Sequence, residues 1–134
     1  MTADSDKLLL NQYSTQFLSG MSKRMRDSCS GSELNEFIQE RFTFFREAIR
    51  RSGMVRVRKQ KISQFPFTSK KHSSCLIVEI VSPDAPFIVV TVEALMRQLD
   101  LLILSKLHPI IGVELTKGRE IKKVFFTSTG TREI

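Results

Sequence analysis

The sequence of 134 residues contains no tryptophan, one tyrosine, two cysteines and two histidines. Cys29 and Cys75 are far apart and have no metal-ligand neighbours, so we interpret them as separate reduced thiols. His72 and His108 are also isolated, and neither has a second His or Cys at ligand spacing. The sequence therefore predicts no metal site.

Motifs of common enzymes are missing as well. The six glycines are isolated and form neither a phosphate-binding loop nor a dinucleotide fingerprint. No serine lies in a G-x-S-x-G nucleophile turn. We therefore expect no catalytic residues and no cofactor in this segment.

Long hydrophobic runs are absent too. None approaches the roughly 20 apolar residues of a membrane span. The N-terminus is acidic at first and lacks the basic segment, apolar region and cleavage site of a secretory signal. We expect a cytoplasmic protein without a membrane partner, and its 41% hydrophobic content suits one modest core.

The net charge of +7 is concentrated in one region. Residues 41–72 hold ten Lys or Arg and one acid, whereas residues 1–40 carry four bases and six acids. Basic side chains with interleaved Phe65 and Phe67 resemble a single-strand nucleic-acid surface, which makes nucleic-acid binding through Arg50–Lys71 the alternative hypothesis. We favour a solvated face or an interface with another part of a larger protein. This basic belt consists of Arg56, Arg58, Lys59, Lys61, Lys70 and Lys71.

Two amphipathic helices are predicted in the first part of the chain. Residues 5–20 place apolar side chains at spacings of three and four, and Gly20 is a plausible stop. Whether Met21 and Met25 extend this helix or form a short turn stays open. Ser30 and Glu33 form a capping-box pattern before a second helix that ends near Gly53. Its apolar stripe is Leu34, Ile38, Phe42, Phe45 and Ile49.

Two strands are predicted next. Val55 and Val57 alternate with arginines, which indicates a half-buried strand with a basic outer face. Residues 75–81 are nearly all apolar, as in a central strand. Glu79 interrupts this run, and a buried carboxylate costs several kcal/mol unless it is paired. We therefore expect Glu79 to face solvent or a sheet edge, with Leu76, Val78 and Ile80 opposite.

The rest of the chain predicts a helix and two more strands. Asp84 followed by Ala85 and Pro86 is a helix-start pattern. The expected buried face of this helix is Ile88, Val92, Leu95 and Leu99. Residues 101–115 are expected to form one bent strand or two short ones, with a structural histidine or a kink at His108-Pro109. Residues 121–127 then return as the second strand of a hairpin.

The predicted fold class is α+β, with a mostly antiparallel sheet. Residues 1–53 would be a helical lead-in and residues 54–134 an α+β module, the two forming one compact unit. The order strand, helix, strand, strand after residue 74 is the first part of a ferredoxin-like plan, in which the third strand inserts between the first two.

The segment from Ser82 to Val92, S-P-D-A-P-F-I-V-V-T-V, resembles the N-terminal region of the large bacterial NAD-specific glutamate dehydrogenases. Those enzymes have a D-x-P-F-L-V-D-S-V motif after a strand, then a helix of the form M-x-L-N-R and a β segment containing H-P. The resemblance extends from about Leu8 to Lys123 and includes the V-R-V strand at residues 55–57. The matching positions are Asp84, Pro86, Phe87, Ile88, Val89, Val92, residues 95–97 and His108-Pro109.

This resemblance implies a non-catalytic regulatory or assembly module with an incomplete ACT-like fold. The parent enzyme would oxidatively deaminate L-glutamate to 2-oxoglutarate and ammonia with NAD, at a catalytic region farther along the polypeptide. Implied partners are the rest of that polypeptide, further copies of the protein and an amino-acid effector. The effector would bind at the turn between strand and helix, formed by Asp84, Ala85, Pro86, Phe87, Val90 and Thr91.

One departure from the family pattern affects this expectation. Val90 and Thr91 stand where the family has Asp and Ser, so an acceptor is missing from the turn. We therefore give more weight to packing and assembly than to ligand capture. A scaffold that only self-associates is a third hypothesis. We also expect residues 55–61 to pair beside residues 75–81, because an unpaired central strand would expose its amide groups.

Overall fold

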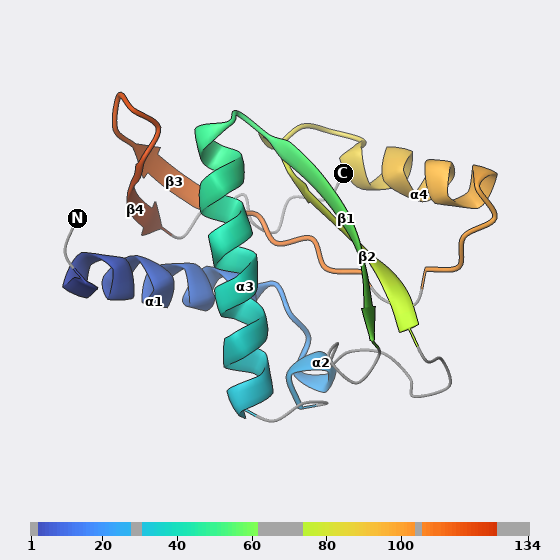
Figure 1. Ribbon diagram of the computed structural model, residues 1–134, viewed down its shortest axis with the longest axis horizontal. Coiled ribbons are helices and arrows are strands. Elements are labelled where there is room, and N and C mark those ends of the chain that lie inside the picture. The colour runs from blue at the N-terminus through green and yellow to red at the C-terminus, as the bar shows by residue number, and fades with distance from the viewer. Residues whose placement is uncertain (1–2, 28–30, 62–73, 104–105, 126–134) are drawn as a thin grey trace.

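The computed structural model describes residues 3–27, 31–61, 74–103 and 106–125 (Figure 1). Helix α3 crosses the middle of the molecule, with α1 and the β3–β4 hairpin on one side and the β1–β2 hairpin on the other (Figure 1). The elements are α1 (Ala3–Ser19), α2 (Lys23–Asp27), α3 (Gly31–Arg50), β1 (Met54–Lys61), β2 (Ser74–Val81), α4 (Ile88–Gln98), β3 (Gly112–Leu115) and β4 (Ile121–Phe125).

The two predicted N-terminal helices are confirmed as α1 and α3. Helix α1 ends at Ser19, and Gly20 follows as expected. Met21 and Met25 do not extend α1: Met21 is buried in the turn after it, and Met25 lies on the separate short helix α2. Ser30 lies outside the described residues, so the predicted capping box is not observed in full.

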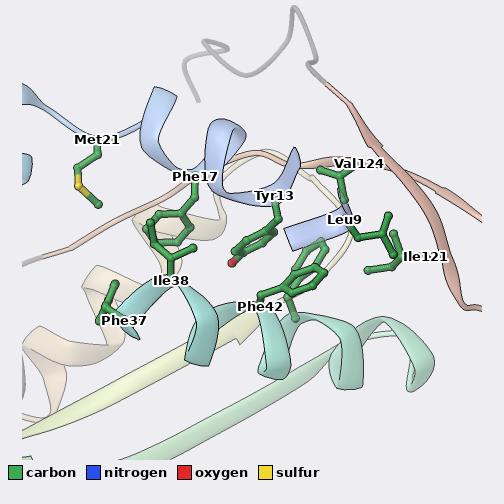
Figure 2. Close-up of a cluster of buried hydrophobic side chains, with 10 residues drawn as sticks. Leu9, Tyr13, Phe17, Met21, Phe37, Ile38, Phe42, Ile121 and Val124 are labelled. Atoms are coloured by element: carbon green, nitrogen blue, oxygen red, sulfur yellow. The ribbon is translucent and has the colours of Figure 1, made fainter. Parts of the chain in front are cut away.

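The core forms where α1, α3 and β4 meet. Tyr13 lies between Phe17 and Phe42, with ring centroids 5.8 and 4.9 Å away (Figure 2). Ile121 and Val124 of β4 close the same cluster from the other side. Burial of these side chains against each other supplies most of the hydrophobic stabilisation of the fold. The buried members are Leu9, Tyr13, Phe17, Met21, Phe37, Ile38, Phe42, Phe45, Ile121 and Val124.

A tight turn links α3 to β1. Ser52 and Gly53 adopt positive φ angles of 62° and 125°, and the Gly53 amide donates to the Ala48 carbonyl at 2.8 Å. The left-handed conformation that closes α3 is therefore taken by Ser52 and not by the predicted Gly53, which follows it with a positive φ that glycine adopts without steric cost. The chain then reverses into β1.

Strands β1 and β2 pair along their whole length. The pairing is antiparallel, from Met54 opposite Val81 to Lys61 opposite Ser74. This confirms the prediction that residues 55–61 cover an edge of the strand at residues 75–81. Paired residues point to the same face, so Arg56 lies directly beside Glu79.

Strands β3 and β4 form a second antiparallel hairpin, also as predicted. Within the described part of residues 101–115, however, only residues 112–115 form a strand. Asp100 has a positive φ of 56°, and Pro109 has no amide hydrogen to donate to a ladder. In the described residues, one short strand therefore stands where one long bent strand or two short strands were expected.

The α+β class with antiparallel strands is confirmed, but in the described residues the strands form two separate two-stranded sheets. The third strand of the ferredoxin-like plan, β4, was expected between its predecessors. It pairs with β3 as predicted, but in the described residues it does not pair with β2 and packs on α1, because Ile121 and Val124 are buried in the helical core. Core burial therefore determines where β4 lies.

Helix α4 differs from its predicted form. It begins at Ile88, after Phe87 at the N-cap position, rather than at Asp84. None of its residues is buried; Ile88 and Val92 are half-buried, while Leu95 and Leu99 are exposed. The predicted buried face is thus covered only in part.

Candidate effector turn and buried arginine–glutamate cluster

The predicted effector turn lies between β2 and α4. Asp84, Pro86 and Phe87 are exposed, and Ala85 is half-buried. Phe87 is 65% exposed and has a left-handed backbone with φ 69°, which is unusual for a bulky residue. The turn therefore presents an aromatic ring to solvent.

The first turn of α4 places the other two predicted residues nearby. Val90 and Thr91 are exposed, and the Thr91 amide donates to the Phe87 carbonyl at 2.9 Å. The N-cap makes no side-chain hydrogen bond to the helix. The structure thus brings all six predicted residues to one exposed turn, and effector binding there stays a prediction.

The basic belt is arranged differently from the prediction. Arg56 and Arg58 are half-buried and point toward α3, whereas Val55 and Val57 are 63% and 57% exposed. The prediction that the valines face inward and the arginines face outward was therefore wrong. The reason is electrostatic, because the inward face of β2 carries Glu79, which binds both arginines.

Only part of the belt remains a basic surface. Lys59 is exposed. The Lys61 side chain, Lys70 and Lys71 lie outside the described residues, as do Phe65 and Phe67. With Arg56 and Arg58 occupied by ion pairs, the described part gives no support to a nucleic-acid surface.

Glu79 lies at the centre of the charged cluster. Glu79 is only 8% exposed, so the prediction that it faces solvent or a sheet edge was wrong. Arg56 donates from Nη2 to both carboxylate oxygens at 2.8 and 3.0 Å, and from Nε to Oε1 at 3.0 Å. On the other side, Arg41 Nε lies 3.0 Å from Oε2. The pairing required for a buried carboxylate is thus provided by two elements, β1 and α3.

Arg41 is the cluster member that sequence reasoning missed. It is 8% exposed and stacks over Phe37, with Cζ 4.7 Å from the ring centroid. Arg56 stacks similarly over Phe44 at 4.5 Å. Helical spacing could have indicated that Arg41 is buried, because it lies four residues after Phe37 and three after Ile38 on the buried face of α3.

Burial and neighbouring charges shift two pKa values here. Burial lowers the pKa of Arg41 most, and Arg58 and Arg56 lower it further, whereas Glu79 and Glu40 oppose this. Burial is also the main reason why the pKa of Tyr13 is raised. Arg41 lowers this pKa slightly, and Glu79 raises it slightly. Tyr13 therefore connects the apolar core electrostatically to the charged cluster.

The outer face of the β1–β2 sheet is largely apolar, with the exposed Lys59 opposite Leu76 toward one end. Val55 lies opposite Ile80 and Val57 opposite Val78 on this face. Val55, Val57, Ile80 and Leu76 are exposed there. We call Val55, Val57, Leu76, Val78 and Ile80 the outer apolar face. Contiguous exposed apolar surface of this kind is typical of interaction sites.

No group of three or more His, Cys, Asp or Glu is placed to hold a metal ion in the described part of the chain. No helix in the described ranges is long and apolar enough to cross a membrane. His108 is exposed, next to a half-buried Pro109.

The arrangement defines a small α+β module with an exposed strand–helix turn and an uncovered sheet face. Comparison with protein families matches residues 13–133 to the family described as glutamate dehydrogenase, ACT1 domain. The chain belongs to this family, and the resemblance inferred from its sequence is confirmed. No curated protein and no solved structure matches the chain.

Proposed function

We propose that the chain is a regulatory or assembly module of an NAD-dependent glutamate dehydrogenase. The observation that carries this proposal is the family match over residues 13–133. In this proposal, a catalytic region elsewhere in the same cytoplasmic polypeptide binds NAD. That region would convert L-glutamate to 2-oxoglutarate and ammonia, and the module itself would contribute no catalytic residue.

Assembly is the part of the proposal that the described surface favours. In the described part of the chain, the outer apolar face exposes Val55, Val57, Leu76 and Ile80. Phe87 and Val90 add exposed apolar surface at the start of α4. Interfaces of obligate assemblies bury such surface against a partner. The partner would be another part of the parent polypeptide or another copy of it.

An amino-acid effector at the turn formed by Asp84, Ala85, Pro86, Phe87, Val90 and Thr91 is the regulatory form of the proposal. A ligand at concentration L that binds only the folded state stabilises it by RT ln(1 + L/Kd), so the melting temperature rises with the logarithm of ligand concentration above Kd. Such a rise for one amino acid and not for others, lost when Phe87 is changed to alanine, would support a sensor. A flat response to all amino acids, with concentration-dependent association of the protein, would support an assembly role.

The decisive test of the parent enzyme is the reading frame beyond Ile134, followed by an assay of the encoded polypeptide. We expect the frame to continue into a dehydrogenase region whose product reduces NAD with L-glutamate. A stop codon after Ile134 would contradict the proposal. A continuing product that fails to use L-glutamate would also contradict it.

A further inference from the structure

The rim of the buried charged cluster holds a carboxylate between two guanidinium groups. Glu40 Oε2 accepts hydrogen bonds from Arg41 Nη2 and Arg58 Nη2, both at 3.2 Å. The arginines come from α3 and β1, so two elements form this position. Both contacts are longer than the 2.7–2.9 Å usual for charge-assisted hydrogen bonds. About half of the Glu40 side chain is exposed, at 47%.

Positive charge exceeds negative charge in this cluster. Among the described residues, Arg41, Arg56 and Arg58 are paired with Glu79 and Glu40 alone, a surplus of one formal positive charge. Burial lowers the pKa of Arg41 most, Glu79 and Glu40 raise it, and Arg58 and Arg56 lower it through the repulsion of like charges. An additional negative charge at the rim would reduce this repulsion.

Some donors of the cluster are also poorly used. The buried Nε atoms of Arg41 and Arg58 lie 3.0 and 3.5 Å from Glu79 oxygens but form no hydrogen bond with them. These two donors face Glu79 on the inner side of the cluster, so a group bound at the Glu40 rim would use the Nη2 atoms that Glu40 uses now. Arginine pairs bind carboxylates well, because the guanidinium fork matches carboxylate geometry.

We propose that Arg41 and Arg58 form a binding seat for the carboxylate group of a small molecule, and that Glu40 closes this seat when no ligand is bound. Carboxylate is the ligand class because the seat already holds one. The ligand would displace the Glu40 side chain into solvent and take over its two guanidinium contacts. This seat uses none of the residues of the predicted effector turn and does not depend on the identity of the parent enzyme.

The Glu40→Gln variant gives the sharpest test, because it removes the internal competitor at an exposed position. Exposed ion pairs contribute about 0.2–1 kcal/mol, so glutarate affinity should increase up to about fivefold. Affinity would be measured by calorimetry or NMR titration of the full chain with glutarate, at constant ionic strength adjusted with sodium chloride. Removing any carboxylate raises the attraction for anions, so Glu47→Gln, which removes the partly exposed carboxylate paired with Arg51, is the charge-matched control. An equal increase in both variants would contradict the proposal.

The complementary variant is Arg58→Gln, which removes half of the seat. Glutarate affinity should fall at least tenfold. Arg51→Gln is the matched control, since Arg51 is an exposed arginine paired with Glu47 at 3.0 Å and belongs to the turn after α3. The control should bind glutarate as the unchanged protein does. Amide spectra of the variants establish that each one is folded.

Three further outcomes would overturn the proposal. One is a glutarate response that does not saturate or equals that of sodium chloride. A second is equal loss in Arg58→Gln and Arg51→Gln, which would indicate general charge attraction. The third is unchanged or weaker glutarate binding by Glu40→Gln. Tighter binding of inorganic phosphate than of glutarate would overturn the assignment to carboxylates.

Discussion

The two hairpins of this module are attached to its helices by different forces. The β3–β4 hairpin packs through Ile121 and Val124 into the apolar core beneath α1. The β1–β2 hairpin faces α3 with a buried carboxylate, Glu79, surrounded by arginines, while its opposite face is exposed. Only the second hairpin combines a charged inner contact with an apolar outer face.

This difference suggests where the module can respond to its surroundings. Apolar packing depends little on salt or on charge, whereas ion pairs depend on their partners' charge and on solvent access. The β1–β2 hairpin carries the outer apolar face and leads into the predicted effector turn. The contacts most open to regulation are therefore next to the surfaces proposed for assembly and effector binding.

Changing Glu79 to Gln should have the largest effect. It leaves Arg41 and Arg56 without their shared counter-charge, and breaking a buried ion pair in this way costs about 3–5 kcal/mol. The free energy of unfolding would be measured by urea denaturation. Glu114→Gln is the control, because Glu114 is exposed and lies 3.9 Å from Lys122. Equal losses in the two variants would contradict a central role for Glu79.

Changing Ile121 to Ala should have the next largest effect. The side chain is almost completely buried, and such truncations cost about 2–5 kcal/mol through lost transfer energy and the cavity left behind. The loss should be nearly the same at low and high salt, because no charge is removed. A marked salt dependence would contradict apolar attachment of the β3–β4 hairpin.

The buried Tyr13 side chain should make the protein less stable at alkaline pH. Its pKa is raised by burial above the ordinary 10.0, so the unfolded chain loses the phenol proton first. This contribution is intact below about pH 10 and should then decline by about 1.4 kcal/mol per pH unit. Tyr13→Phe should remove that part of the pH dependence. If the stability of the unchanged protein and of Tyr13→Phe falls equally with rising pH, Tyr13 is not held as a buried neutral phenol.

The Arg50–Glu120 pair should give the smallest effect, because both side chains are about half exposed. Arg50 donates to Glu120 at 2.9 and 3.1 Å, and this hydrogen bond lowers the pKa of Glu120. The stabilisation should be present at neutral pH and lost as the pH falls through the lowered pKa. The small stability difference between the unchanged protein and Glu120→Gln should therefore disappear in acid. A difference that grows in acid would have the wrong sign.

Much of the local structure could be predicted from sequence because apolar spacing is decided within each element. The stripe of α3, the Gly53 turn and both hairpins follow from such spacing and from turn residues. The family could also be recognised, because Asp84, Pro86 and Phe87 form a compact motif.

The orientation of β1 could not be predicted from alternation alone. Valines and arginines alternate there, so either set can face inward, and the choice depends on Glu79 and Arg41 in other elements. The position of β4 was missed for a related reason. Its packing partners, such as Leu9 and Tyr13, lie more than a hundred residues earlier.

Amide hydrogen exchange in Glu79→Gln tests most directly whether the two hairpins are attached by different forces. We predict faster exchange across β1 and β2, because their charged contact with α3 is lost. The amides of β3 and β4 should keep the protection that they have in the unchanged protein, since their apolar packing is intact. Uniformly faster exchange in both hairpins, or unchanged protection of β1 and β2, would contradict this account.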